Sequence, residues 1–157
     1  MIELVEVNMD DANTVIDIQK QCFSEYLQKY HDDDVNPANE TLEHLNKVII
    51  NEAWDIYIIK YNGENAGIIK VNKFDADTYK INDFGISPKF RDRNIGTMVF
   101  LKVEELYTYA KVWILSTILQ ESRCIHFYEK LGFKRTTDRE PTILNKNMTI
   151  VGYKLVR

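Results

Sequence analysis

The sequence predicts an α+β fold in which helices layer one β-sheet, built as a single domain over residues 1–157. Three observations favour this fold: strand patterns and helix patterns succeed each other along the chain, an Asn62-Gly63 pair predicts a hairpin, and no repeat, low-complexity tract or linker interrupts the sequence. A chain of 157 residues buries roughly 68 to 70% of its unfolded surface, so a core forms without disulfides or a structural metal.

The first third of the chain predicts one strand and two helices. Residues 2–7 alternate apolar and acidic side chains, which indicates a strand, and residues 8–13 supply helix-capping side chains. Apolar residues then recur at near-helical spacing until about residue 27. A polar loop over residues 31–37 separates this helix from a second one, expected over about residues 38–52.

The middle of the chain predicts antiparallel strands. Residues 55–61 are rich in β-branched and aromatic side chains, and the turn at residues 62–65 leads into a second strand over residues 66–73. A further strand over residues 79–86 carries Gly85 near its end, where we expect a bulge.

The last part of the chain predicts two helices among strands. A helix follows the segment 91–96 and extends to about residue 110, and residues 112–118 form a strong strand. A short helix over residues 121–131 ends at Gly132, in a C-terminal cap position. Two more strands complete the chain, at about residues 133–137 and 148–156.

Composition excludes several classes of protein. Twenty basic against 24 acidic residues give a formal net charge of −4, without the Lys/Arg stripe that a nucleic-acid partner requires. The longest apolar runs are far shorter than the roughly 20 residues that cross a bilayer, and the N-terminus lacks a signal-peptide pattern, so we expect a cytoplasmic protein without a membrane partner. Cys22 and Cys124 are expected to be reduced core thiols, and the scattered His residues predict no metal site.

The segment most informative about chemistry is a strand end, a basic loop and a helix start at residues 86–97. Backbone N–H groups at a helix N-terminus lack intrahelical partners and bind anions. Arg91 and Arg93 add positive charge, Asn94 tolerates a positive φ, and Gly96 permits a close approach of the backbone. On physics alone, an ordinary strand-to-helix turn explains the same residues equally well, and the P-loop and dinucleotide-binding patterns are absent.

Two motifs resemble one known family. Pro88-x-x-Arg91-x-x-Asn94-x-Gly96 is similar to the Arg/Gln-x-x-Gly-x-Gly/Ala pyrophosphate loop of the GNAT superfamily of acyl-CoA N-acyltransferases. Residues 124–133, with Cys124, Tyr128, Gly132 and Phe133, resemble that family's Ala-x-x-x-Tyr-x-x-x-Gly-Phe helix. The resemblance implies a GNAT-like single domain whose central sheet is mostly antiparallel, with a splayed parallel pair made of residues 79–86 and 112–118.

The resemblance also implies acetyl-CoA as the co-substrate. Pantetheine would pair with the main chain at Phe84, Gly85 and Ile86, and the pyrophosphate would bind the amides of the loop. The implied loop residues are Arg91, Asp92, Arg93, Asn94, Ile95, Gly96 and Thr97. Two residues depart from the family pattern: Asn94 replaces a glycine at a modest conformational cost, and Glu121 replaces a frequent Asn and places a carboxylate near the expected phosphates.

Two side chains are candidates for the reaction itself. Tyr128 matches the family tyrosine that hydrogen-bonds the departing sulfur; packing as a buried aromatic is the alternative interpretation. Because a phenol with a pKa of about 10 is a weaker acid than a thiol with a pKa of about 8.5, a hydrogen bond to the sulfur is as reasonable as complete proton transfer. Asp83 is a candidate general base acting through water, and an exposed or turn-stabilising carboxylate is its alternative.

The acceptor is expected to be an amine on a small molecule or a peptide. The acidic loop His31-Asp32-Asp33-Asp34 favours a cationic acceptor, although such runs are also common in solvated loops. Trp54 and Tyr57 could wall an acceptor pocket or pack in the core.

The leading functional hypothesis is an N-acetyltransferase in which a primary amine attacks acetyl-CoA directly. A non-catalytic coenzyme A binding or sensing module is the alternative, and an interaction domain that kept only the fold is a weaker third. The family resemblance also suggests a homodimer, paired through strand edges near the C-terminus.

Overall fold

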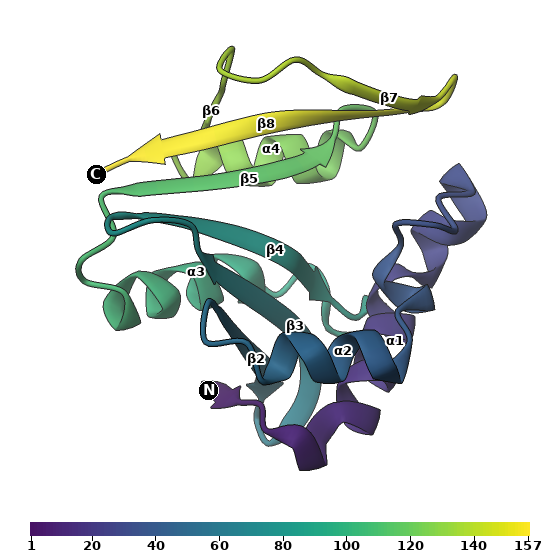
Figure 1. Ribbon diagram of the computed structural model, residues 1–157, viewed down its shortest axis with the longest axis vertical. Helices are drawn as coiled ribbons and strands as arrows, with labels where there is room; N and C mark the ends of the chain where they lie inside the picture. The colour runs from purple at the N-terminus through teal and green to yellow at the C-terminus, as the bar shows by residue number, and fades with distance from the viewer.

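The computed structural model describes all 157 residues and contains one eight-stranded sheet with helices on both faces (Figure 1). The strands are β1 (Ile2–Glu6), β2 (Trp54–Tyr61), β3 (Glu64–Lys73), β4 (Thr78–Ile86), β5 (Val112–Ile118), β6 (Lys134–Arg135), β7 (Thr142–Asn145) and β8 (Met148–Val156). The helices are α1 (Ala12–Tyr30), α2 (Leu42–Ile49), α3 (Ile95–Leu106) and α4 (Ser122–Lys130). No helix is both long and apolar enough to cross a bilayer.

The order of the strands in the sheet is β1-β2-β3-β4-β5-β8-β6, with β7 paired to β8. Every neighbouring pair is antiparallel except β4 with β5, which is parallel. The predicted α+β fold, with a mostly antiparallel sheet and one parallel pair, is therefore confirmed.

The second helix is shorter than the sequence predicts. Pro37–Asn39 forms a separate 3₁₀ turn, and α2 begins only after Thr41, whose hydroxyl accepts the N–H of His44 at 3.1 Å. A proline at the start of the turn and a capping threonine thus divide the expected helix into two pieces. The preceding helix, α1, is longer than predicted and ends at Tyr30, followed by His31 in the left-handed conformation.

The C-terminal third also differs from the prediction. The strand expected at residues 133–137 is reduced to the two residues of β6, and the sequence analysis missed β7. The sequence of β7 does not alternate between apolar and polar side chains, because the apolar Ile143 and Leu144 are adjacent. Both side chains are exposed. The pairing of β7 with β8 through a tight turn, rather than burial, defines this strand.

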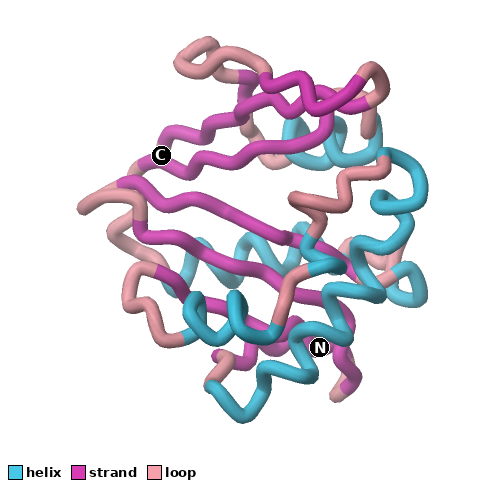
Figure 2. The backbone as a smooth tube through the Cα atoms, turned by 45° about the vertical axis from the view of Figure 1, so that its right-hand side comes forward, coloured by secondary structure: helices cyan, strands magenta, loops and turns pink.

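Two apolar layers sandwich the first half of the sheet. Side chains of α3, with Trp113 and Phe133, form the larger core on one face, and α1 and α2 pack on the other face around Leu45. Successive residues of β2 alternate between the layers, with Ile58 in the α1 layer and Ile59 in the α3 layer. Figure 2 shows the helices on both faces of the strands.

The parallel pair is short. Only Thr78, Tyr79 and Lys80 of β4 pair with β5, opposite Val112, Trp113 and Ile114. Beyond these residues the two strands diverge, as Figures 1 and 2 show. Beyond the paired residues, β4 and β5 therefore each have one edge that no neighbouring strand covers.

A bulge interrupts β4 where it leaves β5. Asn82 pairs with Lys70 and Gly85 pairs with Ile68, so two residues of β4 lie opposite Ile69 alone. Asp83 takes a positive φ of 46° within the bulge. The predicted bulge therefore exists, one to two residues before Gly85.

Gly85 is required for a different reason. An added Cβ would lie 2.6 Å from the Phe23 ring and 2.9 Å from Cβ of Cys22, so α1 leaves no room for a side chain there.

Candidate active site

A cleft of about 680 Å³ opens where β4 and β5 separate. Its walls come from both strands, the start of α3, α4, the end of α1 with the following loop, and β7. The volume lies within the range of small-molecule and cofactor sites, about 300 to 1,000 Å³. Every predicted site residue except Arg93 lines this cleft: Asp83, Phe84, Gly85, Ile86, Arg91, Asp92, Asn94, Ile95, Gly96, Thr97 and Tyr128.

One end of the cleft is formed by backbone N–H groups. The N–H groups of residues 92–97 have no hydrogen-bond partner within the protein, and the first helical bond of α3 runs from Met98 N–H to the carbonyl of Asn94, at 3.2 Å. Asp92 and Asn94 both take left-handed conformations with φ of 61°. Asn and Asp adopt this conformation more readily than other side chains. The loop therefore directs a row of donors at the helix N-terminus, which is a geometry that binds anions.

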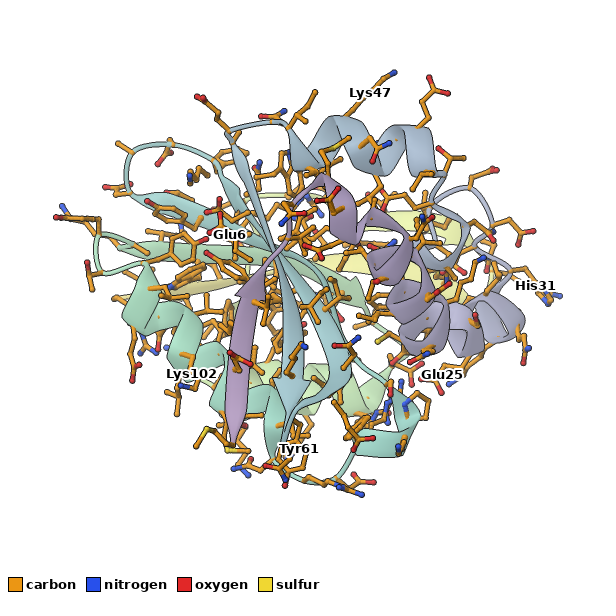
Figure 3. The ribbon with its side chains drawn as sticks, turned by 90° about the horizontal axis from the view of Figure 1, so that it is seen from below. Glu6, Glu25, His31, Lys47, Tyr61 and Lys102 are labelled. Carbon is orange, nitrogen blue, oxygen red and sulfur yellow. The ribbon has the colours of Figure 1, made fainter.

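The two loop arginines position the loop rather than supplying free charge. Arg91 donates to the carbonyls of Ile86 at 3.1 Å and Cys22 at 3.4 Å, and it forms an ion pair with Glu25 at 2.6 Å. Glu25, labelled in Figure 3, lies on α1, so Arg91 ties the loop to that helix. Arg93 lies outside the cleft with its guanidinium over the rings of Tyr61 and Phe90. Arg91 lines the cleft with its charge already paired, and Arg93 lies outside it, so the free donors of the loop are main-chain N–H groups.

Gly96 has a packing role that the sequence did not reveal. A Cβ at this position would lie 3.0 Å from two ring atoms of Phe127 on α4. The Phe127 ring also packs edge-on against Phe84 of β4, with centroids 5.9 Å apart. Phe127 thus bridges the amide loop and the splayed strand, and Gly96 provides the space for its ring.

Tyr128 lies in the cleft on α4. Its ring packs against Phe127 and Phe133, with centroid distances of 5.1 and 5.8 Å, while its hydroxyl has no hydrogen-bond partner within the protein. Burial raises the pKa of Tyr128 above its ordinary value, and the nearby Cys124 and Tyr26 raise it further. The hydroxyl therefore keeps its proton and can act as a hydrogen-bond donor.

Both cysteines are free thiols. Burial raises the pKa of Cys22 to about 12, against the opposing charge of Arg91. Burial also raises the pKa of Cys124, whose sulfur lies 3.7 Å from the hydroxyl of Tyr26. Cys22 is fully buried as expected, whereas Cys124 is only partly buried and lines the cleft.

Asp83 belongs to a buried ion-pair network. Its Oδ2 lies 2.9 Å from Nζ of Lys70, which is only 2% exposed, and the same Nζ donates to Oε1 of Glu40 at 2.8 Å. Burial opposes ionisation of Glu40, but the ammonium of Lys70 and a hydrogen bond from Gln19 outweigh it and lower the pKa of Glu40. Asp83 is thus held in place by β3, and its side chain, 31% exposed, lies at the wall of the cleft.

The sequence analysis missed Lys70. The available signal was a single charged residue within the apolar run Ile68-Ile69-Lys70-Val71, a pattern that indicates a buried, paired lysine. Its partners, Glu40 and Asp83, lie 30 and 13 residues away in sequence, so only the fold identifies them.

Only part of the acidic loop reaches the cleft. Asp32 lines it and accepts two hydrogen bonds from Nδ2 of Asn36, at 3.1 and 3.3 Å. Asp33 and Asp34 are exposed, and Figure 3 shows His31 pointing away from the protein. The loop therefore contributes one carboxylate to the site.

Glu121 does not line the cleft. Its Oε2 accepts hydrogen bonds from the hydroxyl of Tyr30 and from Nζ of Lys29, the latter at 3.1 Å. These contacts join the end of α1 to the start of α4, so the carboxylate is directed at α1.

Trp54 and Tyr57 do not line the cleft, so their interpretation as acceptor-pocket walls is wrong. They lie on β2, which β3 separates from β4. The hydroxyl of Tyr57 is 2.9 Å from that of Tyr107, and its ring packs on the α3-side core.

The fold and the cleft together define a class of protein with a cleft between two splayed parallel strands and free N–H groups at the start of the following helix. Residues 12–133 match the family model described as "Acetyltransferase (GNAT) family". The match covers more than half of the chain, which therefore belongs to the GNAT acetyltransferase family. No curated protein matches the sequence significantly.

Solved structures share the fold at low sequence identity. An acetyltransferase from Thermus thermophilus has a TM-score of 0.78 at 12% identity, covering 100% of this chain and 97% of its own. The paia N-acetyltransferase from Thermoplasma acidophilum, in complex with coenzyme A, has a TM-score of 0.76 at 18% identity, covering 97% and 98%. Spermidine N-acetyltransferase from Vibrio cholerae, with CoA and spermine, has a TM-score of 0.76 at 12% identity, covering 99% and 95%.

Proposed function

We propose that this protein is an N-acetyltransferase that transfers the acetyl group of acetyl-CoA to a primary amine by direct attack. The observation that carries the proposal is the presence, in one cleft, of the unpartnered N–H groups of residues 92–97 and the unpartnered hydroxyl of Tyr128. Family membership supports it, and so do similar structures that contain acetyl-CoA or coenzyme A.

The amide row suits the pyrophosphate of the coenzyme. Phosphate oxygens at a helix N-terminus accept backbone N–H groups and are stabilised by the helix dipole. The uncovered edge of β4 at Phe84, Gly85 and Ile86 suits pantetheine, because an extended chain of amides can pair with a free strand edge. Recognition through the main chain explains why the left-handed Asn94 can replace a glycine in this loop.

Tyr128 would donate a hydrogen bond to the departing sulfur. A thiolate develops on the leaving group when the amine attacks, and a positioned donor stabilises that charge. With ordinary pKa values, complete proton transfer from phenol to thiolate is unfavourable by roughly 2 kcal/mol. The raised pKa of Tyr128 makes complete transfer still less favourable. Hydrogen bonding without proton transfer therefore fits this tyrosine best.

The acceptor amine would meet Asp83. An alkyl amine with a pKa of about 10.4 is almost entirely protonated at pH 7, so it arrives as an ammonium and must lose a proton before attack. The carboxylates of Asp83 and Asp32 line the cleft and favour an ammonium there. Lys70 engages Oδ2 of Asp83, which leaves Oδ1 to bind the ammonium or to order a water that receives its proton.

A non-catalytic coenzyme-binding module is the second candidate. The ion pair between Asp83 and Lys70 favours it, because the carboxylate proposed as the general base is already partnered. Both candidates require the coenzyme, and they differ in whether any amine is acetylated.

A thermal-shift titration with acetyl-CoA, with adenosine nucleotides as controls, tests the coenzyme site. Ligand at 100 times its dissociation constant adds about 2.7 kcal/mol, which for a domain of this size raises the midpoint by roughly 5 to 10 °C. Thiol release with a panel of amines then tests transfer. A shift together with transfer supports the enzyme, a shift without transfer to any amine supports the binding module, and no shift at millimolar coenzyme contradicts both.

A further inference from the structure

We propose that the amine acceptor also carries a carboxylate, which binds between Lys80 and Arg139 at the edge of the cleft where β4 and β5 separate. The inference deepens the proposed function and rests on it. It assigns the acceptor to a chemical class: an amine that carries an anionic group a few bonds from its nitrogen. The two cations that would bind this anionic group lie outside the amide loop and away from Tyr128 and Asp83.

Lys80 lies at the point of the splay. It is the last residue of β4 that pairs with β5, opposite Ile114. Its neighbour Tyr79 packs on the α3-side core, so the Lys80 side chain projects to the opposite face of the sheet. Asn82 follows on that same face and lines the cleft, so Lys80 lies next to the part of the cleft wall that Asn82 forms.

Arg139 lies near the same point on the side of β5. It belongs to the loop between β6 and β7 and donates a hydrogen bond to Oγ of Ser116. Ser116 lies two residues beyond Ile114 on β5, on the same face as Lys80, and it lines the cleft. Arg139 is exposed and forms no ion pair, and the neighbouring Asp138 is paired with Lys154 at 3.3 Å. Most of its N–H donors therefore remain available to a ligand.

Neither cation is compensated within the protein. Lys80 is half-buried but its ammonium has no ion-pair or hydrogen-bond partner, in contrast to that of Lys70, which has two carboxylate partners. Burial lowers the pKa of Lys80, and the charge of Arg139 lowers it further, against a smaller opposing effect of Asp83. Two cations that repel each other beside a cleft are stabilised by an anion bound between them, and a guanidinium suits a carboxylate in particular.

The spacing selects among amines. Asp83 follows Lys80 by three residues, about 10 Å along a strand, and its carboxylate lies on the same face through its contact with Lys70. An acceptor with its ammonium at Asp83 would place a carboxylate at the cation pair if the two groups are on the order of 5 to 10 Å apart. An ω-amino acid or a short peptide meets this requirement. A polyamine would place a second ammonium against Lys80 and Arg139.

Three amines of equal length test the inference: 6-aminohexanoate, hexylamine and 1,6-diaminohexane, compared by kcat/KM for thiol release from acetyl-CoA. We expect kcat/KM for 6-aminohexanoate to exceed that for each of the other two amines by about tenfold or more. The carboxylate of 6-aminohexanoate gains a charge-assisted hydrogen bond, whereas the second ammonium of the diamine meets two like charges. Equal or better turnover of the diamine would overturn the inference while leaving the N-acetyltransferase proposal intact.

Variants connect the preference to the two side chains. In Arg139→Gln and in Lys80→Met, the ratio of kcat/KM for 6-aminohexanoate to that for hexylamine should fall about tenfold. Lys146→Gln is the matched control, since it removes one positive charge from an exposed side chain in the β7–β8 turn. An unchanged ratio in both Arg139→Gln and Lys80→Met, or an equal fall in Lys146→Gln, would overturn the assignment.

A binding measurement separates this inference from the failure of catalysis. Hexanoate has the carboxylate but no amine, and calorimetry of the wild-type protein with saturating coenzyme A should detect its binding. We expect the affinity to fall at least about fivefold in Arg139→Gln and to be retained in Lys146→Gln. If no amine is acetylated but hexanoate binds in this way, the carboxylate site stands and the transferase proposal fails. If hexanoate does not bind, or binds Arg139→Gln equally well, the carboxylate site fails.

Discussion

In one part of the cleft, ligand groups would meet the main chain: the N–H groups of residues 92–97 and the uncovered edge of β4. In the other part they would meet side chains: Asp32 and Asp83 on the wall of the cleft, and the proposed pair Lys80 and Arg139 at its edge. A site made of main-chain groups depends on backbone conformation, so many sequences can form it. A site made of side chains depends on the identity of each residue, so a single substitution can change it. This difference is consistent with solved structures that share the fold at only 12 to 18% identity.

The largest effect should come from the tyrosine between the two halves. Tyr128→Phe removes only the hydroxyl and keeps the ring contacts with Phe127 and Phe133. We expect kcat to fall about tenfold or more, with the affinity for acetyl-CoA within about twofold, because the hydroxyl acts on charge that develops only during transfer. Single-turnover thiol release measures the effect. The control is Tyr57→Phe, outside the cleft, and unaltered turnover in Tyr128→Phe would remove this residue from the mechanism.

The main-chain half can be disturbed without touching a ligand-binding side chain. In Gly96→Ala the new Cβ would lie 3.0 Å from the Phe127 ring, so either the ring or the start of α3 must shift. We expect the dissociation constant of acetyl-CoA to rise about five- to tenfold, with kcat at saturation changing by less than about twofold.

A second substitution tests the cause of this loss. Phe127→Leu provides space beside the new methyl group, so the double variant should recover most of the affinity that Gly96→Ala loses. Calorimetry of the single and double variants measures this coupling. If Phe127→Leu does not restore affinity, the contact between Gly96 and Phe127 is not what shapes the amide loop.

The side-chain half should respond in KM for the amine rather than in coenzyme affinity. Asp83→Asn keeps the shape of the residue but removes the charge beside Lys70. We expect KM for the amine to rise about three- to tenfold, with the dissociation constant of acetyl-CoA unchanged. Asp33→Asn, at an exposed carboxylate of the acidic loop, is the control. A rise in the acetyl-CoA dissociation constant alone would contradict the division between the two halves.

The dependence of kcat on pH gives a smaller effect. Burial raises the pKa of Tyr128, so the protonated hydroxyl persists above the ordinary pKa of a tyrosine, and its hydrogen bond is lost only at still higher pH. We therefore expect no decline of kcat with rising pH up to about pH 10, while deprotonation of the amine increases the rate. Profiles of the wild type and Tyr128→Phe should have the same shape. A decline below about pH 10 that Tyr128→Phe abolishes would contradict this protonation state.

The smallest effect is expected at Asn94. Its φ of 61° suits glycine, so Asn94→Gly relieves a modest conformational cost in the folded loop but adds freedom to the unfolded chain. We expect the affinity for acetyl-CoA to improve by no more than about threefold, with stability changing by less than about 1 kcal/mol. Calorimetry and thermal unfolding measure both. A large loss of affinity would mean that the Asn94 side chain itself contacts the coenzyme.

Most of the fold could be predicted because its signals are local. The hairpin between β2 and β3, the strand β5 and the helix that ends before Gly132 all have patterns within a few residues. The division of the second helix and the existence of β7 were not predictable from periodicity, because a capping turn defines one and pairing with β8 defines the other.

The candidate site, like the fold, has features that local sequence predicts and features that it does not. The main-chain half was predicted from one continuous loop, apart from Arg93, which stacks on aromatic rings outside the cleft. In the side-chain half, Asp83 and the acidic loop were predicted, whereas Lys70, Lys80 and Arg139 were missed. Glu121 is bound by α1 rather than directed at phosphates, and neither Trp54 nor Tyr57 lines the cleft.

The sequence by itself therefore determined the elements, the amide loop and the tyrosine helix, because each depends on residues adjacent in the chain. Only the tertiary structure decided which charges meet: Lys70 with Glu40 and Asp83, and Arg139 with Ser116. These partners lie 13 to 30 residues apart in sequence. Sheet pairing and the bulge in β4 fix the distances between these side chains. Whether a charged side chain is paired or free depends on those distances.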